Sequence, residues 1–295
     1  MEQITSVFIS IAYALIIMVC APLVAGIIKT AKAGLQNRRG PLILQPYYDI
    51  LKLLQKDSVQ SPTTSWIFTL APYVYFAGAF GAAALLPAGD LFALIYLLAA
   101  GRFFLALASL DAGSAFGGMG GSREMFINVL VEPMLLLAML TVAGQAGSTG
   151  LAAMSGAAAS APLSLPYIFS ASAFLILLLA ETGRIPIDNP DTHLELTMIH
   201  EGMVLEYSGR WLGLIFWASA IKQLVFIILF ITLFLPWQPG GVSPATTLLW
   251  TAGKVVFAAL LLATIETSTN KMRLFKVPGF IGVAGMLALL ALVAQ

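Results

Sequence analysis

Residues 181–206 read ETGRIPIDNPDTHLELTMIHEGMVLE, and they separate the apolar runs LPYIFSASAFLILLLA at 165–180 and WLGLIFWASAIKQLVFIILFITLFLP at 211–236. Each flanking run is long enough to be a membrane-spanning helix. The segment between them holds six of the fourteen acidic residues of the chain: Glu181, Asp188, Asp191, Glu195, Glu201 and Glu206. This alternation predicts a bundle of membrane helices in which the acidic segment has a functional role.

The composition of the whole chain supports the same class of protein. Apolar residues make up 59% of the sequence and charged residues 10%, whereas about a quarter of the residues in a soluble domain are charged. Apolar windows predict an all-α membrane protein with eight spans, at residues 5–28, 66–86, 91–110, 125–146, 165–180, 211–236, 246–265 and 278–294. A net charge of +1 argues against a nucleic-acid partner.

The basic residues predict the orientation of the bundle. If the first loop lies inside, twelve of the fifteen lysines and arginines fall in inner loops, three fall within spans and none lies outside. This predicts a multi-pass protein of a prokaryotic cytoplasmic (inner) membrane, with both termini on the periplasmic side. Residues 1–295 then form a single polytopic domain whose inner-face loops are 29–65, 111–124, 181–210 and 266–277.

The first apolar run is expected to be a retained helix, because it lacks a basic leader and a cleavage site of small residues. Its Cys20 is the single cysteine of the chain, too few for a disulfide or an iron–sulfur site. The spacing of His193 and His200 does not suggest a metal site. No Ser/His/Asp or Cys/His grouping indicates nucleophilic catalysis. We therefore expect a non-catalytic subunit that binds no cofactor itself.

Four ionisable residues fall inside predicted spans. Arg102 and Glu132 lie about 12 Å and about 10 Å from the inner ends of consecutive antiparallel helices, so they could pair. Lys222 and Lys254 lie about 16 Å from the inner side, near the midplane. A charge in the bilayer costs about 2.5–3.5 kcal/mol even on lenient scales, and such residues often mark an ion path. The alternative is a structural ion pair that locks helices together.

The inner-face loops contain a second helical signal. Tyr47, Ile50, Leu51 and Leu54 follow helical spacing and predict a short amphipathic helix on the inner membrane surface or under a partner. Five glycines at 111–124 favour a flexible turn and close helix approach rather than a nucleotide site. Candidate residues for docking a soluble partner are Gln36, Arg38, Arg39, Asp49, Lys52 and Arg123.

Several strings in the chain point to a known family. They are GLQNRRGP at 34–41, DILKL at 49–53, SRE at 122–124, VEP at 131–133, ETGRIPID at 181–188 and EYSG at 206–209. In this order they resemble the complex I subunit 1 family over nearly the whole chain. The strings RFFLA at 102–106, LDAGS at 110–114 and IKQL at 221–224 are similar to the branch found in membrane-bound nickel–iron hydrogenases. That branch includes hydrogenase-4, formate hydrogenlyase and energy-converting hydrogenases.

The resemblance implies an eight-helix subunit that joins an electron-transfer arm to antiporter-like membrane subunits. The implied partners are hydrogenase-like large and small subunits and a ferredoxin-like iron–sulfur subunit, which would hold the nickel–iron centre and the iron–sulfur clusters. Glu132 matches the intramembrane glutamate nine residues after the family arginine, here Arg123. The implied proton pathway comprises Glu132, Glu181, Asp188, Asp191, Glu195, Glu201 and Glu206, with Arg102, Lys222 and Lys254.

Two departures separate the chain from the quinone-reducing branch. His193 stands where that branch usually has a glutamate, and three additional residues lie between Glu195 and Glu206. Both count against a conventional quinone cavity. They also set the chain apart from the typical formate hydrogenlyase pattern and place it nearer the ferredoxin-linked energy-converting hydrogenases. We therefore expect a membrane-anchor and proton-coupling subunit of a hydrogenase-type complex. The alternatives are the quinone-site subunit of an NADH:quinone oxidoreductase-like complex and a stand-alone ion transporter, which the absence of an internal repeat disfavours.

Overall fold

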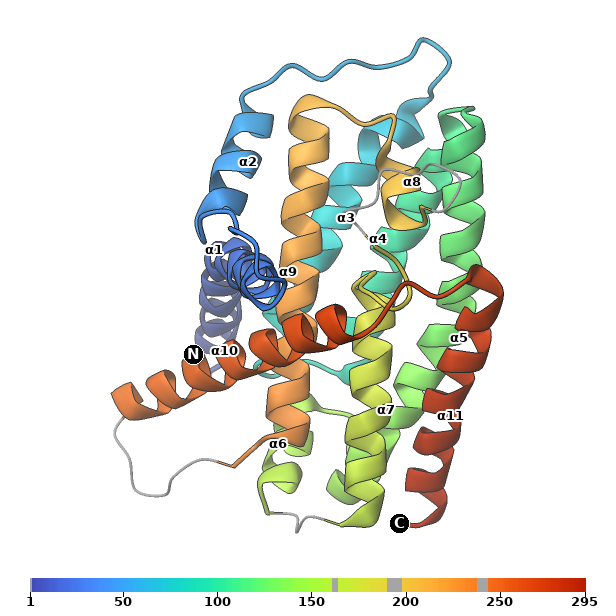
Figure 1. The fold of residues 1–295 in the computed structure, drawn as a ribbon. Coiled ribbons are helices and arrows are strands. Elements are labelled where there is room, and N and C mark those ends of the chain that lie inside the picture. Colours follow the sequence, from blue (N-terminus) through green and yellow to red (C-terminus); the bar gives the residue numbers. More distant parts are fainter. Residues whose placement is uncertain (1, 161–163, 190–197, 238–243) are drawn as a thin grey trace.

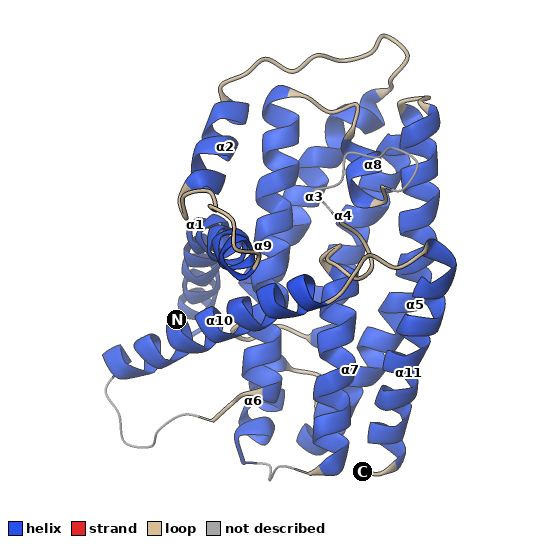
Figure 2. Ribbon diagram, viewed as in Figure 1, coloured by secondary structure: helices blue, strands red, loops and turns tan. Residues whose placement is uncertain are grey.

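The computed structural model describes residues 2–160, 164–189, 198–237 and 244–295. Within these residues every regular element is a helix (Figure 2). The elements are α1 (Glu2–Leu35), α2 (Gln45–Leu54), α3 (Trp66–Leu85), α4 (Leu91–Asp111), α5 (Ala115–Ala146), α6 (Leu151–Ser160), α7 (Leu165–Glu181), α8 (His200–Val204), α9 (Gly209–Phe234), α10 (Pro244–Ser268), η1 (Leu274–Lys276) and α11 (Val277–Val293).

The predicted all-α membrane fold is confirmed. Seven helical segments of the described chain are long and apolar enough to cross a membrane, namely α1, α3, α4, α5, α9, α10 and the continuous η1–α11. The remaining predicted span is α7, which is shorter at 17 residues. The amphipathic helix is confirmed as α2, which buries Pro46 and Ile50 and leaves Tyr48 and Leu51 exposed. The placement of both termini outside stays a prediction.

Three predicted loops contain more helix than expected. The inner loop 111–124 is helical from Ala115 onward, because Ser114 caps α5 by accepting a hydrogen bond from the Gly117 amide at 3.0 Å. Residues 266–268 of the loop 266–277 belong to α10, and the outer connection 147–164 contains α6. The expected close approach at the glycines is confirmed, since a Cβ on Gly120 would lie 2.8 Å from the α8 backbone.

Figure 1 shows how the helices are arranged. In this view α3, α4, α5, α7, α9 and α11 run side by side, while α10 lies across them and contacts α1 and α9. Helices α2 and α8 lie at one end of the bundle, called here the α2 end, and α6 lies at the opposite α6 end together with the C-terminus. The described parts of the acidic segment 181–206 therefore belong to the α2 half of the molecule.

Helix α7 ends inside the bundle rather than at its edge. Gly183 adopts a φ of +58°, and the amides of Gly183 and Arg184 donate to the carbonyls of Ala180 and Leu179. This left-handed closure ends the helix and suits glycine, which has no Cβ. Figure 1 shows the end of α7 level with the middle of α9. As a result Glu181 lies at mid-depth in the bundle.

The α6 half of the bundle is packed by aromatic side chains. Phe174 of α7 is fully buried against three phenylalanines of α9, with ring centroids 6.4 Å from Phe226, 6.1 Å from Phe230 and 5.3 Å from Phe234. Tyr167 adds a ring 5.7 Å from Phe234 and donates to the Leu233 carbonyl at 2.6 Å. Large buried rings of this kind dominate packing energy. They fix α7 against α9 and so set the position of Glu181.

Candidate functional site

Five buried or half-buried polar side chains from four helices meet near the middle of the bundle. We call this group the Arg102 cluster: Arg102 of α4, Asn128 and Glu132 of α5, Glu181 of α7 and Lys222 of α9. Arg102 donates to Glu132 Oε1 at 2.8 Å, to Glu181 Oε2 at 2.6 Å and to Asn128 Oδ1 at 2.9 Å. Lys222 Nζ lies 3.1 Å from the same Glu181 oxygen. The pairing of Arg102 with Glu132 predicted from their depths is confirmed.

The members of the Arg102 cluster differ in exposure. The Glu181 side chain is 0% exposed and that of Arg102 4%, whereas the Glu132 side chain is 29% exposed. Desolvating two charges costs several kcal/mol per ion, and mutual attraction only approximately repays that cost. A buried network of this kind is therefore expected to add little net free energy to the stability of the fold. Glu132 is the carboxylate through which the cluster reaches the surface of this chain.

Several atoms of this region have no hydrogen-bond partner within the described protein. Arg102 Nε, Glu181 Oε1 and Gln223 Nε2 are buried and make no hydrogen bond to the described residues. Glu266 Oε2 also accepts no hydrogen bond from them, although it lies 3.3 Å from Lys32 Nζ in an ion pair. Buried polar groups are almost always satisfied by protein or by ordered water. Four such atoms, two in the Arg102 cluster and two on Gln223 and Glu266, therefore favour a hydrated region over a dry, closed set of salt links.

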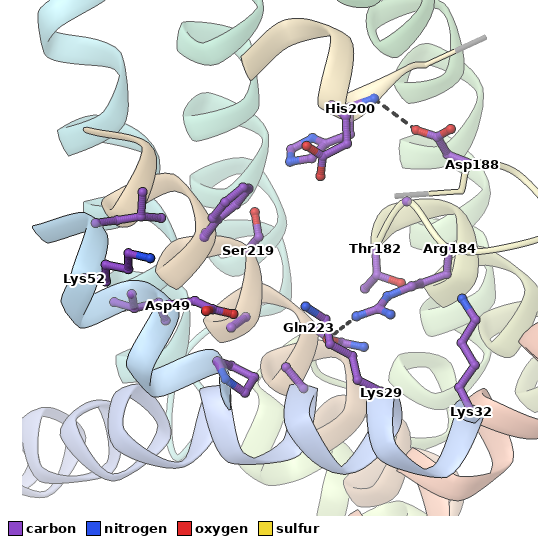
Figure 3. A pocket seen from close by; sticks show the side chains of 18 of the residues that line it. Lys29, Lys32, Asp49, Lys52, Thr182, Arg184, Asp188, His200, Ser219 and Gln223 are labelled. Carbon is purple, nitrogen blue, oxygen red and sulfur yellow. Dashed lines mark hydrogen bonds between the residues drawn. The ribbon is translucent and has the colours of Figure 1, made fainter. Parts of the chain in front are cut away.

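Asp188 organises the acidic segment. One of its oxygens accepts from the Ile199 and His200 amides at 3.2 Å and 3.1 Å, and the other accepts from Lys271 Nζ at 2.8 Å. The hydrogen bond to His200 is visible in Figure 3. Charge-assisted hydrogen bonds of this kind are about twice as strong as neutral ones. Asp188 thus anchors the start of α8 to the chain that follows α7.

A cavity of about 620 Å³ opens on the α2 half of the bundle beside these groups (Figure 3). Its walls come from α1, α2, the chain after α7, α8 and α9. Eight of its nineteen lining residues are charged: Lys29, Lys32, Asp49, Lys52, Lys56, Arg184, Asp188 and Glu201. Small-molecule pockets are lined mainly by apolar groups. This cavity therefore suits water and ions better than an apolar ligand.

The other predicted pathway residues are placed less centrally. Glu201 is half-buried and lines the cavity, whereas Glu206 is exposed. Lys254 lies apart from the Arg102 cluster, in an apolar pocket near the α6 end where its Nζ donates to the Leu235 carbonyl. Asp191 and Glu195, together with His193, lie outside the described residues. The roles of all these residues in proton transfer stay predictions.

The predicted docking residues fall into two groups. Gln36, Arg38, Arg39, Asp49 and Lys52 are exposed around α2 and the turn before it. Arg123 is half-buried, and its guanidinium donates to the Met198 carbonyl at 3.0 Å. Arg123 therefore holds the chain that leads into α8, in addition to any contact with a partner. Docking itself stays a prediction for all six residues.

Sequence reasoning missed a second buried group around Glu266. This carboxylate lies 3.3 Å from Lys32 Nζ and 3.3 Å from Arg184 Nη1, and Arg184 also donates to Gln223 Oε1 at 2.8 Å. The end of the apolar run at residue 265 predicts a loop from Glu266 onward. The signal that could have identified the residue is helical periodicity continuing past that run to Ser268.

Comparisons with known proteins agree with this architecture. Residues 8–295 match the family model described as NADH dehydrogenase. The chain is 38% identical to formate hydrogenlyase subunit 4 of Escherichia coli strain K12, covering 91% of this chain and 92% of the relative. It is 37% identical to hydrogenase-4 component C of the same organism, covering 90% of this chain and 89% of the relative.

Two further matches are more distant. The chain is 32% identical to a subunit of the NADH-quinone oxidoreductase of Syntrophobacter fumaroxidans, covering 90% of this chain and 86% of the relative. A chain of the membrane-bound sulfane sulfur reductase, an archaeal respiratory membrane complex, has the same fold, with a TM-score of 0.82 at 19% identity. That match covers 100% of this chain and 99% of the other.

Proposed function

The chain belongs to the NADH dehydrogenase family, and on that premise we propose that it is the membrane-anchor and proton-coupling subunit of a complex I-like, hydrogenase-type complex. Its relatives at 38% and 37% identity are components of formate hydrogenlyase and of hydrogenase-4. The electron carriers, a nickel–iron centre and iron–sulfur clusters, would lie in partner subunits. The role of this chain is to connect their redox changes to proton movement in the membrane.

The observation that carries this proposal is the Arg102 cluster. Glu181 is sealed inside the bundle between Arg102 and Lys222, while Glu132 shares Arg102 and is partly exposed. A negative charge that arrives nearby favours the protonated form of a carboxylate. Arg102 remains charged throughout, because guanidinium does not lose its proton in proteins. Protonation of one carboxylate therefore frees Arg102 to bind the other more strongly, which couples the two sites.

The cavity supplies access for protons from the α2 end. Asp188 and Glu201 line it, as does Gln223, which directly follows Lys222 on α9. A proton entering from the cavity would reach Glu181 through water, because Glu181 does not itself line the cavity. Water would also carry the proton from Glu181 to Glu132, since Arg102 only changes its carboxylate partner and releases no proton. The partial exposure of Glu132 would allow a neighbouring antiporter-like subunit to take up the proton.

Substitution of Glu132 tests the proposal. In the intact complex reconstituted into lipid vesicles, we expect Glu132→Gln to reduce proton translocation per turnover to about a tenth or less of wild type, because it removes a positioned proton carrier. Glu132→Asp should retain most of the translocation. Asp57→Asn is a matched control, since it removes an exposed acid beyond α2. Wild-type translocation and turnover in Glu132→Gln would exclude this role for Glu132.

A quinone-site subunit is the second candidate function. The cavity volume of about 620 Å³ falls within the range of small-molecule sites, and one relative is a subunit of an NADH-quinone oxidoreductase. The density of charge on the cavity walls is the observation against it. Quinone that copurifies with the complex, or inhibition by quinone-site ligands, would support this candidate. Hydrogen evolution by a quinone-free preparation would exclude it.

The proposed partners follow from the hydrogenase-type assignment. They are hydrogenase-like large and small subunits, a ferredoxin-like iron–sulfur subunit and antiporter-like membrane subunits, in the inner membrane of a prokaryote. The exposed basic turn with Arg38 and Arg39 is the proposed contact with the soluble arm. Mass spectrometry of the solubilised complex tests this set: a nickel–iron large subunit should copurify, and Arg38→Ala/Arg39→Ala should reduce its yield.

A further inference from the structure

An apolar pocket between the end of α9 and the first half of α10 lies apart from the Arg102 cluster. Its volume is about 660 Å³, which falls within the range of small-molecule sites. The described residues that line it are Leu235, Trp237, Thr246, Leu249, Trp250, Gly253, Lys254 and Phe257. Seven of these eight residues are uncharged, in contrast to the charged walls of the cavity at the α2 end. The pocket therefore combines one ammonium group with apolar surface.

The ammonium group of Lys254 lies near the end of a full membrane span. Its Nζ donates to the carbonyl of Leu235, the residue directly after α9. Helix α9 has 26 residues, or about 39 Å of helix, which exceeds the hydrocarbon core of about 30 Å. Helix α10 lies across the bundle (Figure 1), so distance along it does not measure depth. The contact with Leu235 therefore places Lys254 near the membrane–water interface at the α6 end.

Two tryptophans of the pocket indicate the same level. Trp237 and Trp250 are 41% and 48% exposed, and Trp250 Nε1 donates to the Trp237 carbonyl at 3.0 Å. Tryptophan is enriched at membrane–water interfaces, where its ring contacts both headgroups and acyl chains. Leu249 and Phe257 are exposed apolar side chains that line the pocket beside Trp250 on α10. The lining is thus amphipathic in the way that a phospholipid is.

No acidic residue is available to Lys254 on the two helices that form the pocket. Residues 211–265 contain no aspartate or glutamate. The carbonyl end of α9 supplies only a partial negative charge, equivalent to about half an elementary charge. A lysine ammonium has three N–H donors, and the hydrogen bond to Leu235 uses one of them. An anionic oxygen from outside this chain would complement the remaining positive charge.

We propose that this pocket binds one anionic phospholipid. The phosphate accepts hydrogen bonds from the Lys254 ammonium, and an acyl chain lies against Leu249 and Phe257. A free phosphate would leave the apolar walls uncovered, and a wholly apolar ligand would leave the cation without a counter-ion. A zwitterionic lipid brings its own cation, so a single lysine favours an anionic headgroup. This site is separate from the proposed coupling function and does not depend on it.

Gly253 allows the pocket to be filled without removing its charge. It lines the pocket next to Lys254, and a Cβ at this position would meet no atom within 4 Å. Gly253→Leu would therefore place its side chain in open space. Leucine is also a better helix former than glycine. We expect this variant to fold, to keep Lys254 and to occupy part of the space that the acyl chain needs.

Photo-crosslinking in lipid vesicles tests the proposal. The intact complex is reconstituted in phosphatidylcholine with a small fraction of diazirine-bearing phosphatidylglycerol or, in parallel, diazirine-bearing phosphatidylcholine. Adducts on peptides that cover residues 244–268 are then measured by mass spectrometry. We expect the phosphatidylglycerol probe to label these peptides about five-fold more than the phosphatidylcholine probe, the ratio expected from one basic residue.

Four variants show which feature of the pocket is responsible. Lys254→Gln should abolish the preference for phosphatidylglycerol, and Lys254→Arg should retain it. Gly253→Leu should lower labelling by both probes several-fold. Lys276→Gln is the matched control, since it removes an exposed lysine of η1, and it should leave the labelling of residues 244–268 unchanged.

Three results would overturn the proposal. Equal labelling of the wild type by the two probes would show ordinary surrounding lipid only. A preference that survives Lys254→Gln, or labelling unchanged in Gly253→Leu, would show that the lipid does not occupy this pocket. Absence of labelling by either probe in the intact complex would mean that a partner subunit covers it. None of these results depends on proton translocation, so each would leave the coupling function untouched.

Discussion

Helix α9 has two halves that are stabilised in different ways. Toward the α6 end its buried face carries Phe226, Phe230 and Phe234, which pack on Phe174 of α7. Toward the α2 end the same helix carries Lys222 and Gln223, which contact Glu181 and Arg184. One half is held by apolar packing and the other by ion pairs and hydrogen bonds, although both lie inside the bundle.

The difference between the halves supports the proposed place of the coupling function. Aromatic packing stabilises without a desolvation cost, whereas a buried ion pair is often no more stabilising than apolar residues of the same volume. If stability were the sole requirement, phenylalanine or leucine could continue through positions 222 and 223. We therefore attribute Lys222 to the proposed coupling function rather than to packing, with Gln223 as a hydrogen-bond partner of Arg184 beside it.

The largest effect is expected from Arg102, which pairs with both Glu132 and Glu181 in the half of the bundle toward the α2 end, called here the charged half. Among the described residues, Arg102→Met would leave Glu181 with Lys222 as its one remaining cation and Glu132 without an ion pair. Removing one partner of a buried pair costs about 3–5 kcal/mol. We expect a large drop in the intact complex recovered after detergent extraction, measured by size-exclusion chromatography, together with loss of proton translocation.

Arg102→Met/Glu181→Gln provides the control for that experiment. It removes opposite charges together, so assembly should recover substantially while translocation stays low. If Arg102→Met assembled and translocated protons like wild type, the ion pairs toward the α2 end would be needed neither for assembly nor for proton translocation. The two halves of the bundle would then not differ in function.

A smaller difference is expected between two intramembrane lysines. Lys222→Met removes one of the two cations at Glu181, which should cost about 1–3 kcal/mol and reduce translocation several-fold. Lys254→Met removes a hydrogen bond to the Leu235 carbonyl, worth about 0.5–1.5 kcal/mol. We expect the Lys254 variant to translocate protons at a rate close to wild type. Equal losses in the two variants, measured in parallel vesicle assays, would place Lys254 on the same path as Lys222.

The sequence was sufficient to predict the spans and the first ion pair. Arg102 and Glu132 lie at similar distances from the inner ends of consecutive antiparallel helices, so helical rise alone brings them together. The apolar runs predict the helices for a related reason, because a membrane span has a fixed minimum length. The existence of single helices, and a pairing between two consecutive antiparallel helices, can therefore be predicted from length and depth.

The partners of Glu181 and Glu266 could not be predicted in this way. Glu181 joins Arg102 and Lys222 because Gly183 ends α7 at mid-depth, a tertiary placement that apolar length does not reveal. Glu266 is buried because α10 continues past its apolar run, where the pattern predicts a loop. Lys254 shows that a shared depth does not bring residues together. It has the same predicted depth as Lys222, but it lies apart from the Arg102 cluster.

The smallest effect is expected from a substitution in the aromatic half, where Phe174 packs on α9 toward the α6 end. Phe174→Leu keeps an apolar side chain at a fully buried site while removing ring contacts with Phe226, Phe230 and Phe234. Aromatic contacts of this kind add about 0.5–1.5 kcal/mol beyond their buried area. The thermal midpoint of the complex should fall modestly, while protons translocated per turnover stay at the wild-type value. A loss of coupling with little loss of stability would mean that the packing of α7 on α9 sets the geometry at Glu181, so that the two halves do not act independently.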